Sequence, residues 1–238
     1  MNSVPHAASR VDGFLAGSRD TLAMVVGIVP FGLIFGTLAG PAGLSPWATL
    51  AMSLFVYAGS AQFIAVTLLA AGASLPVIVA TTLIVNLRHA LYSATLLPYV
   101  SDMPRRWRAL LAFLLTDEAF AVLYNRFSSA KGGVDRRRYY LGAALTLYAA
   151  WVGSTGIGVV LGNVIPGIQH WGLEFAMVAS FVGIVVPQLK NSAQIGVALT
   201  AGVVALLAHG LPYQLGLMVA ALVAVAVGVA LEGKGAKA

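Results

Sequence analysis

The sequence contains no cysteine, so disulfide bonds and thiolate metal sites are excluded. Charged residues are also scarce: they make up 9% of the 238 residues, whereas a soluble domain is roughly a quarter charged. Walker loops, nucleotide-binding fingerprints, zinc-ligand spacings and catalytic triads are absent from the sequence as well. We therefore expect no enzymatic activity, no cofactor and no metal.

Apolar residues are abundant, at 59% of the chain with a mean hydropathy of +0.89. They gather in runs of the length that an α-helix needs to cross a bilayer, and no alternating ten-residue segments of a membrane β-barrel occur. The runs are Leu22–Ala39, Trp47–Ala71, Leu75–Tyr99, Leu110–Tyr124, Tyr140–Val164, Leu173–Val186, Ile195–Leu207 and Tyr213–Leu231. The sequence predicts an all-α integral membrane protein, a polytopic helical bundle of about seven or eight hydrophobic segments.

The chain shows no internal boundary between domains. We expect a disordered cytoplasmic tail over residues 1–12, a single transmembrane domain over 13–232 and a short basic tail over 233–238. The net charge of +6 resides in short connections between apolar runs, which favours membrane orientation over nucleic-acid binding. The four tryptophans suit the aromatic belts at the membrane surface.

The basic residues also bear on topology. If every apolar run crosses the membrane, the cluster Arg105–Arg108 lies on the opposite side from the other basic connections. The conflict disappears if the runs 47–71 and 110–124 re-enter and leave on the side they came from, because six full spans then put every basic connection in the cytoplasm. The alternative is a single loop that departs from the statistical rule.

The third apolar run carries the most polar side chains. Arginine in hydrocarbon is costly, so it normally faces a water-filled cavity or a counter-charge. The candidates for substrate binding in this run are Asn86, Arg88, His89 and Tyr92. At 100° per residue, Asn86 and His89 share one helix face and Arg88 and Tyr92 a nearly opposite one. Arg88 holds either a substrate carboxylate or a carboxylate of the protein, and His89 either relays a proton or is simply hydrogen-bonded.

Two earlier runs contain helix-breaking residues. Gly59, Ser60 and Gln62 interrupt the second run with polar groups, and we predict that they bind substrate, since interrupted helices expose backbone dipoles to ligands in many transporters. In the first run, Gly27, Pro30 and Gly32 predict a helix break, and Gly36 follows one turn later to permit close helix contact. The alternative is ordinary packing, because glycine and proline are common in membrane helices.

The fourth run carries two adjacent carboxylates, Asp117 and Glu118. A carboxylate at membrane depth is costly when ionised, so it can exchange a proton or receive a substrate ammonium group. We predict proton coupling at this pair, with Asp117 favoured. The alternative is a helix cap or an ion pair with Arg88 or Arg108.

These polar segments together resemble one known family. The blocks Tyr57–Phe63, Asn86–Tyr92, Leu115–Phe120 and Gly27–Gly32 are similar to those of the AzlC/YgaZ azaleucine-resistance permeases. The chain departs from the pattern at Tyr57, where the family pattern has phenylalanine. The order of apolar runs extends the resemblance over residues 13–230.

The resemblance implies export of branched-chain amino acids, and in some members methionine, across the bacterial inner membrane. It also implies a small AzlD/YgaH-like membrane subunit as partner. On this reading the transport is secondary, the polar segments bind the zwitterion, and Phe31, Phe63 and Leu91 form the pocket for the alkyl group. Two rival interpretations are a channel-like pore for a small solute or ion and a membrane scaffold that transports nothing.

Overall fold

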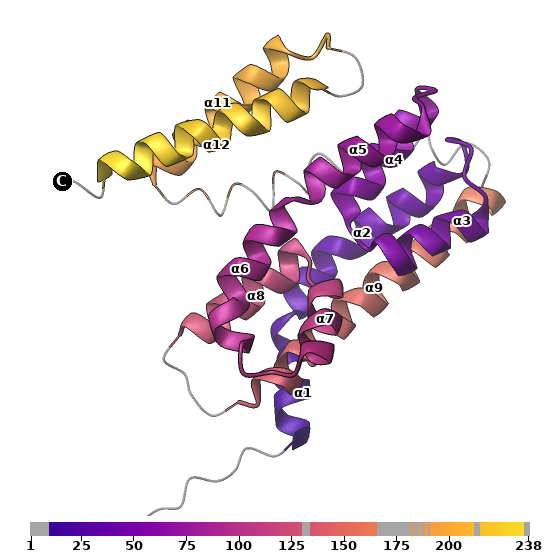
Figure 1. Ribbon diagram of the computed structural model, residues 1–238. Coiled ribbons are helices and arrows are strands. Elements are labelled where there is room, and N and C mark those ends of the chain that lie inside the picture. Colours follow the sequence, from indigo (N-terminus) through magenta and orange to yellow (C-terminus); the bar gives the residue numbers. More distant parts are fainter. Residues whose placement is uncertain are drawn as a thin grey trace, which may run out of the picture.

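The computed structural model describes residues 10–129, 134–165, 191–211 and 215–235, with the single residues Val182, Val186 and Leu189. Within these residues all regular structure is helical (Figure 1), which confirms the all-α prediction. The helices are α1 (Arg10–Asp20), α2 (Leu22–Ala39), α3 (Pro46–Ala51), the π-helical turn η1 (Met52–Val56), α4 (Gly59–Ala70), α5 (Leu75–Asn86), α6 (Arg88–Val100), α7 (Arg105–Phe113), α8 (Asp117–Ser128), α9 (Arg136–Val164), α11 (Ser192–Leu207) and α12 (Leu215–Gly235).

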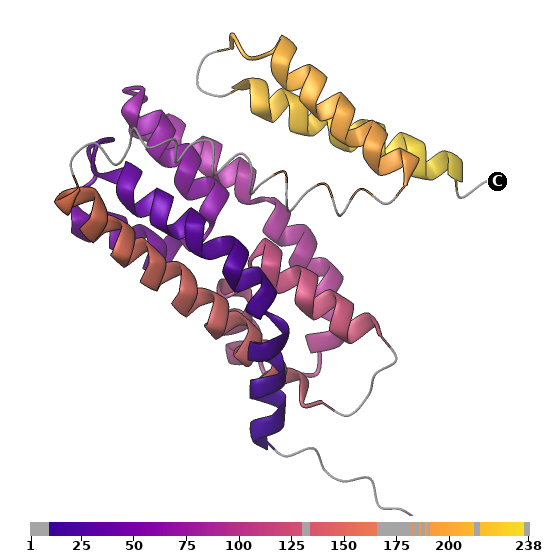
Figure 2. The same cartoon turned by 180° about the vertical axis from the view of Figure 1, so that it is seen from behind.

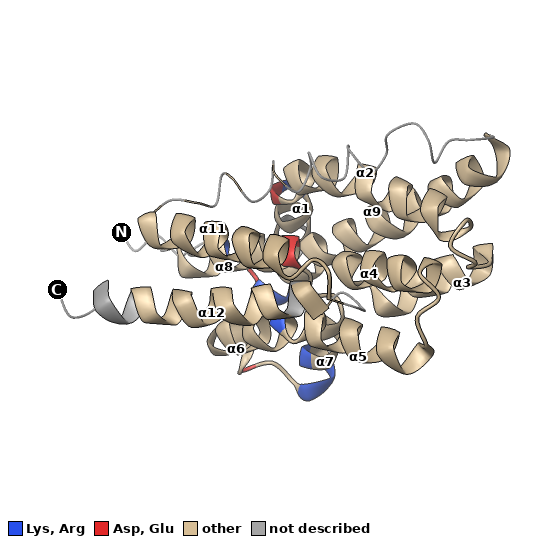
Figure 3. Cartoon of the chain, turned by 90° about the horizontal axis from the view of Figure 1, so that it is seen from above, with Lys and Arg blue, Asp and Glu red and all other residues tan. Residues whose placement is uncertain are grey.

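Three of these stretches are long and apolar enough to cross a membrane: Leu22–Ala39, Leu75–Val100 and Arg136–Val164. Shorter apolar helices accompany them, and Figure 3 shows how few charged residues the described helices carry. The total number of crossings stays a prediction, and the predicted run Leu173–Val186 lies almost wholly outside the described residues.

Helices α1 and α2 both pack along α9 and run parallel to it (Figure 2). Glycines permit the close approach. A Cβ atom on Gly36 would lie 2.7 Å from the amide nitrogen of Val159, and a Cβ atom on Gly17 would lie 2.8 Å from that of Ala143. Small residues at such contacts let helix backbones pack closely in membranes, so the contact expected at Gly36 is present.

The second apolar run folds as a helical hairpin, formed by α3, η1 and α4 and called here the first hairpin. On the way in, Leu54 of η1 accepts a hydrogen bond from the Tyr148 hydroxyl of α9 at 2.9 Å. The chain turns at Tyr57 and Ala58, and Phe63 of α4 then packs on Phe35 of α2, with ring centroids 5.9 Å apart. The hairpin therefore places its tip near the middle of α9.

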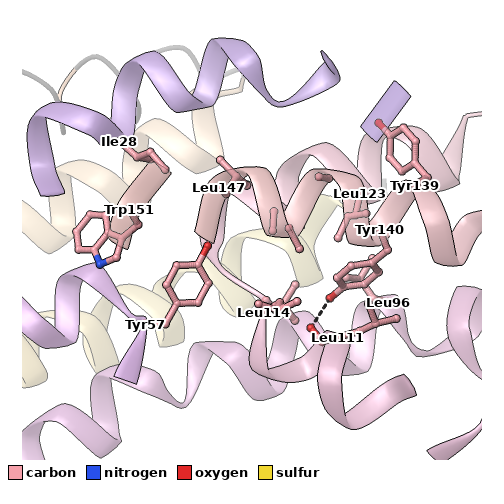
Figure 4. Packing of buried hydrophobic residues seen from close by; sticks show 14 of the residues in the cluster. Ile28, Tyr57, Leu96, Leu111, Leu114, Leu123, Tyr139, Tyr140, Leu147 and Trp151 are labelled. Atoms are coloured by element: carbon pink, nitrogen blue, oxygen red, sulfur yellow. Dashed lines mark hydrogen bonds between the residues drawn. The ribbon is translucent and has the colours of Figure 1, made fainter. Parts of the chain in front are cut away.

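The fourth apolar run turns back in the same way, and α7 with α8 is called here the second hairpin. The Tyr140 hydroxyl donates to the Leu111 carbonyl of α7 at 3.0 Å (Figure 4), and the Phe113 ring lies 6.2 Å from that of Tyr148. After the turn at residues 114–116, α8 returns until Phe127 packs on Tyr139. The α7 helix thus runs with α9 and α8 runs against it.

The second hairpin begins and ends at one end of the bundle, where several basic side chains gather. Arg126 of α8 stacks over the Tyr139 ring at 5.6 Å, and Arg136 stacks over the ring of Tyr99, the penultimate residue of α6, at 5.8 Å. Tyr139 also donates to Asp20 at 2.7 Å, which ties the end of α1 to the same place. This geometry is the one that two re-entrant segments require, while the membrane side itself stays a prediction.

Some predicted boundaries differ from the structure. The α1 helix begins at Arg10, inside the segment expected to be a disordered tail, and α12 continues to Gly235, inside the expected basic tail. More importantly, α2 is continuous from Leu22 to Ala39 with Pro30 inside it, so the predicted helix break at Gly27, Pro30 and Gly32 is wrong. Membrane helices tolerate an internal proline because neighbouring groups satisfy the freed backbone.

Candidate functional site

A cavity lies where the tips of the two hairpins meet the middles of α2 and α9 and the junction of α5 with α6. Figure 4 shows Ile28, Tyr57 and Trp151, three of the residues around it. The lining residues are Ile28, Phe31, Tyr57, Ala58, Gly59, Ser60, Phe63, Arg88, His89, Thr116, Asp117, Glu118 and Trp151. The volume is about 60 Å³, which is room for roughly two waters at their share of liquid volume.

The hairpin tips contact each other through aromatic rings. The Tyr57 ring lies 6.5 Å from that of Phe113 and 4.7 Å from that of Tyr148, the latter edge to face. One tip thus belongs to residues 57–60 and the other to residues 113–118. The cavity between them is lined by residues of both hairpins and of α2, α6 and α9.

Arg88 and Asp117 form an ion pair, with Arg88 Nη1 2.9 Å from Asp117 Oδ2. The other carboxylate oxygen of Asp117 accepts a hydrogen bond from the Tyr92 hydroxyl at 2.6 Å. Arg88 and Tyr92 lie one helical turn apart and so reach the same carboxylate, as their shared face predicts. Both oxygens of Asp117 are therefore engaged by the protein, while the Arg88 Nε is buried without a hydrogen-bond partner in the described residues.

Glu118 is the second carboxylate of the cavity and is placed differently. The ion pairs found among the described residues involve Asp117 and Asp135, and none involves Glu118. Since the charges of Arg88 and Asp117 offset each other, Glu118 gives the lining its remaining formal negative charge.

Two helices begin at the cavity, and their first turns differ. The N-cap of α8 is Thr116, whose hydroxyl accepts from the Ala119 amide at 3.3 Å. The N-cap of α4 is Ala58, which has no side chain to cap with, and the first intrahelical bond runs from the Gln62 amide to its carbonyl. The amides of the first turn of α4 thus have no intrahelical acceptor, so this end attracts negative charge.

The remaining wall is apolar and aromatic. Phe63 packs edge to face on Phe31 at 6.3 Å, and Trp151 is 7% exposed at mid-bundle. The prediction that Trp151 belongs to an aromatic belt is therefore wrong. Of the residues expected around an alkyl group, Phe31 and Phe63 line the cavity, but Leu91 is 69% exposed and does not.

The structure separates the predicted substrate-binding residues into two groups. Gly59, Ser60, Arg88 and His89 line the cavity. Asn86 and Tyr92 do not; the Asn86 Oδ1 is buried without a partner in the described residues, and Tyr92 acts on Asp117. Because α6 begins just after a break at Leu87, Arg88 and His89 both reach the cavity despite their predicted separation on the helix.

Gln62 lies outside the cavity and belongs to a buried polar network. It is fully buried, donates to Ser53 at 3.0 Å and accepts from the Trp151 indole at 3.1 Å. Ser53 in turn lies 2.9 Å from the Thr155 hydroxyl. The network joins the first hairpin to α9 and holds α4 in position, and Gln62 is not among the lining residues. Its assignment to substrate binding stays a prediction.

Five cavity residues were not predicted as site residues: Ile28, Tyr57, Ala58, Thr116 and Trp151. All but Trp151 stand inside a segment already singled out, but their residue types alone do not mark them as functional. The available signal was the position of Tyr57 and Thr116 beside the predicted site residues Gly59 and Asp117.

The chain is similar to known membrane proteins. The AzlC protein family matches residues 23–165. The chain is 33% identical to the inner membrane protein YgaZ of Escherichia coli, over 67% of this chain and 65% of that one. It is 26% identical to the branched-chain amino acid transport protein AzlC of Bacillus subtilis, over 71% and 65% respectively.

A further relative is an uncharacterized membrane protein of Helicobacter pylori strain J99, 34% identical over 85% of this chain and 90% of its own. No solved structure matches the chain. The extent of the family match, which includes both hairpins and the whole cavity, identifies the protein as a member of the AzlC family of membrane transport proteins.

Proposed function

We propose that this protein exports branched-chain amino acids, namely valine, isoleucine and leucine, and also methionine, across the bacterial inner membrane. It acts as the large subunit beside a small AzlD/YgaH-like membrane partner. Family membership and the name of the Bacillus subtilis relative support the substrate class. The proposal rests on the lining of the cavity. Uncapped backbone amides lie at the start of α4, the carboxylate of Glu118 lies at the start of α8, and the wall between them is apolar.

The two ends suit the two charges of an amino acid. The substrate carboxylate binds at the uncapped first turn of α4, where backbone amides at Gly59 and Ser60 carry the positive end of the helix dipole. The substrate ammonium binds Glu118, since Asp117 is already engaged by Arg88 and Tyr92. This assignment reverses the order predicted from the sequence, in which Asp117 was favoured over Glu118.

The apolar wall suits a branched alkyl group. Ile28, Phe31, Phe63 and Trp151 offer no charge to the substrate side chain, and burial of each methylene from water contributes about 0.8 kcal/mol. The cavity volume of about 60 Å³ is smaller than a whole valine, so substrate binding requires the cavity to widen from this conformation. A polar side chain would gain nothing from this wall, which favours aliphatic substrates.

Efflux of preloaded, labelled valine, isoleucine and methionine from cells tests the proposal, with and without the small partner. Glu118→Gln keeps the shape of the side chain but removes its charge, so valine efflux should fall by at least tenfold at unchanged protein level. Arg106→Ala is the matched control, because it also removes a charge but lies exposed at the start of α7. Wild-type rates equal to those of empty cells would reject the transport of these amino acids.

Competing compounds test the two ends separately. In proteoliposomes, 2-oxoisovalerate lacks the ammonium group and isobutylamine lacks the carboxylate, so each should compete with valine far less well than isoleucine does. Equal competition by 2-oxoisovalerate and isoleucine would show that Glu118 receives no ammonium.

A further inference from the structure

Tyr57 has an unusual backbone conformation. Its φ of 43° and ψ of 46° lie in the left-handed region, and within the described part of the chain it is the one residue other than glycine with a positive φ. It ends the π-helical turn η1, and α4 begins two residues later. Residues other than glycine rarely adopt this backbone conformation unless the surrounding structure enforces it, and such residues cluster at functional sites.

The Tyr57 hydroxyl is unusual as well. The residue is 4% exposed, and its hydroxyl, which lies near the Thr116 side chain, makes no hydrogen bond of good geometry within the described residues. Two other buried tyrosines of the bundle are satisfied: Tyr139 donates to Asp20 and Tyr140 donates to Leu111. A buried hydroxyl without a partner is costly, and the structures that keep one usually do so for a ligand or a water.

The surroundings of Tyr57 hold this hydroxyl in place at the cavity. Its ring packs against Phe113 of the second hairpin and against Tyr148 of α9, so it has little freedom to turn away. The residue lines the cavity directly before Ala58 and Gly59. Tyr57 and the uncapped first turn of α4 therefore line the same cavity.

We propose that the Tyr57 hydroxyl is a substrate-binding group that donates a hydrogen bond to the substrate carboxylate. The proposal rests on the proposed function, because it assumes that an amino acid enters this cavity. The carboxylate would then accept bonds from the α4 amides on one side and from the tyrosine on the other. The left-handed backbone at residue 57 ends η1, and the Tyr57 side chain lines the cavity at this turn.

Replacement by phenylalanine distinguishes a tyrosine that binds substrate from a purely structural one. Tyr57→Phe removes only the oxygen, so the ligand-free protein loses an unsatisfied buried group and should unfold at the same temperature as wild type or a higher one. The substrate meanwhile loses a hydrogen bond to its charged carboxylate, so the dissociation constant for valine should rise about tenfold or more. Stability and affinity thus change in opposite directions.

Tyr140→Phe is the matched control, because Tyr140 is equally buried but its hydroxyl is bonded to Leu111 and does not line the cavity. The full-length protein in detergent is heated with increasing valine, which gives both the melting temperature and the valine concentration for half-maximal stabilisation. We expect Tyr140→Phe to lower the melting temperature and leave the valine dependence unchanged. We expect Tyr57→Phe to keep or raise the melting temperature and to increase the valine concentration needed for half-maximal stabilisation.

Two results would overturn the inference while leaving the proposed function intact. One is a Tyr57→Phe protein with the valine affinity of wild type. The other is a Tyr57→Phe protein that loses melting temperature as Tyr140→Phe does, which would show that the hydroxyl is bonded within the protein. Failure of the proposed function has a different signature, since wild-type protein itself would then show no stabilisation by valine and no valine transport.

Discussion

Replacement of Gln62 by leucine separates the structural role of this residue from a role in substrate binding. Leucine has a similar size, so little cavity forms, but the Trp151 indole N–H loses its acceptor. Ser53 keeps its contact with Thr155, so the main cost is a single orphaned donor in a buried site. Such a donor costs about 1–3 kcal/mol, and we take about 2 kcal/mol for Gln62→Leu.

For a chain of this size, about 2 kcal/mol corresponds to a decrease in melting temperature of roughly 4–8 °C. Thermal unfolding followed by size-exclusion chromatography in detergent measures this decrease. The control is Ser60→Ala on the same helix, which lines the cavity and should melt within about 2 °C of wild type. A Gln62→Leu protein that keeps the wild-type melting temperature but loses valine transport would refute the reasoning and return Gln62 to the substrate site.

Two further predictions concern packing and topology. Gly36→Ala places a methyl group against the backbone of α9 and should lower the melting temperature. A methyl group on Gly27 meets nothing within 4 Å, so Gly27→Ala should leave the melting temperature unchanged or raise it. Equal effects of the two substitutions would contradict the close helix contact at Gly36. Single cysteines at Asp102 and Ser128 should react with a membrane-impermeant thiol reagent from one side and a cysteine at Ala71 from the other, because the second hairpin returns to its starting end. Reaction of Asp102 and Ser128 from opposite sides would show that α7 and α8 cross the membrane.

The sequence predicts the hairpins because the positions of the basic clusters restrict how many apolar runs can cross the membrane between them. The basic cluster at Arg105 can share a membrane side with the later basic connections only if an odd number of runs fails to cross between them. Glycine beside serine at residues 59 and 60 similarly marks a break that the structure shows at Tyr57 and Ala58. Long apolar runs and breakers were thus sufficient for the all-helical fold.

The sequence does not predict which polar side chains face the cavity. Asp117 and Glu118 are adjacent, so they point about 100° apart. Only the packing of α8 decides that Asp117 meets Arg88, while Glu118 has no ion pair with any described residue. Gln62 is two residues beyond Ser60 and thus nearly opposite on α4, which places it against Trp151. Pro30 misled for another reason: a proline in a membrane helix need not break it when neighbours satisfy the backbone.

The contact between α2 and α9 also bears on how the protein is made. The ribosome completes α2 at Ala39 but α9 only at Val164, which is 164 − 39 = 125 residues later. At about 5–20 residues per second, this interval lasts roughly 6–25 s. During this interval α9 is not yet available to pack on the glycine face of α2, and the hydrogen bond between Ser53 and Thr155 cannot form. Closure of the bundle is therefore a late event in biogenesis, and during this interval the newly inserted helices are open to association with other membrane proteins.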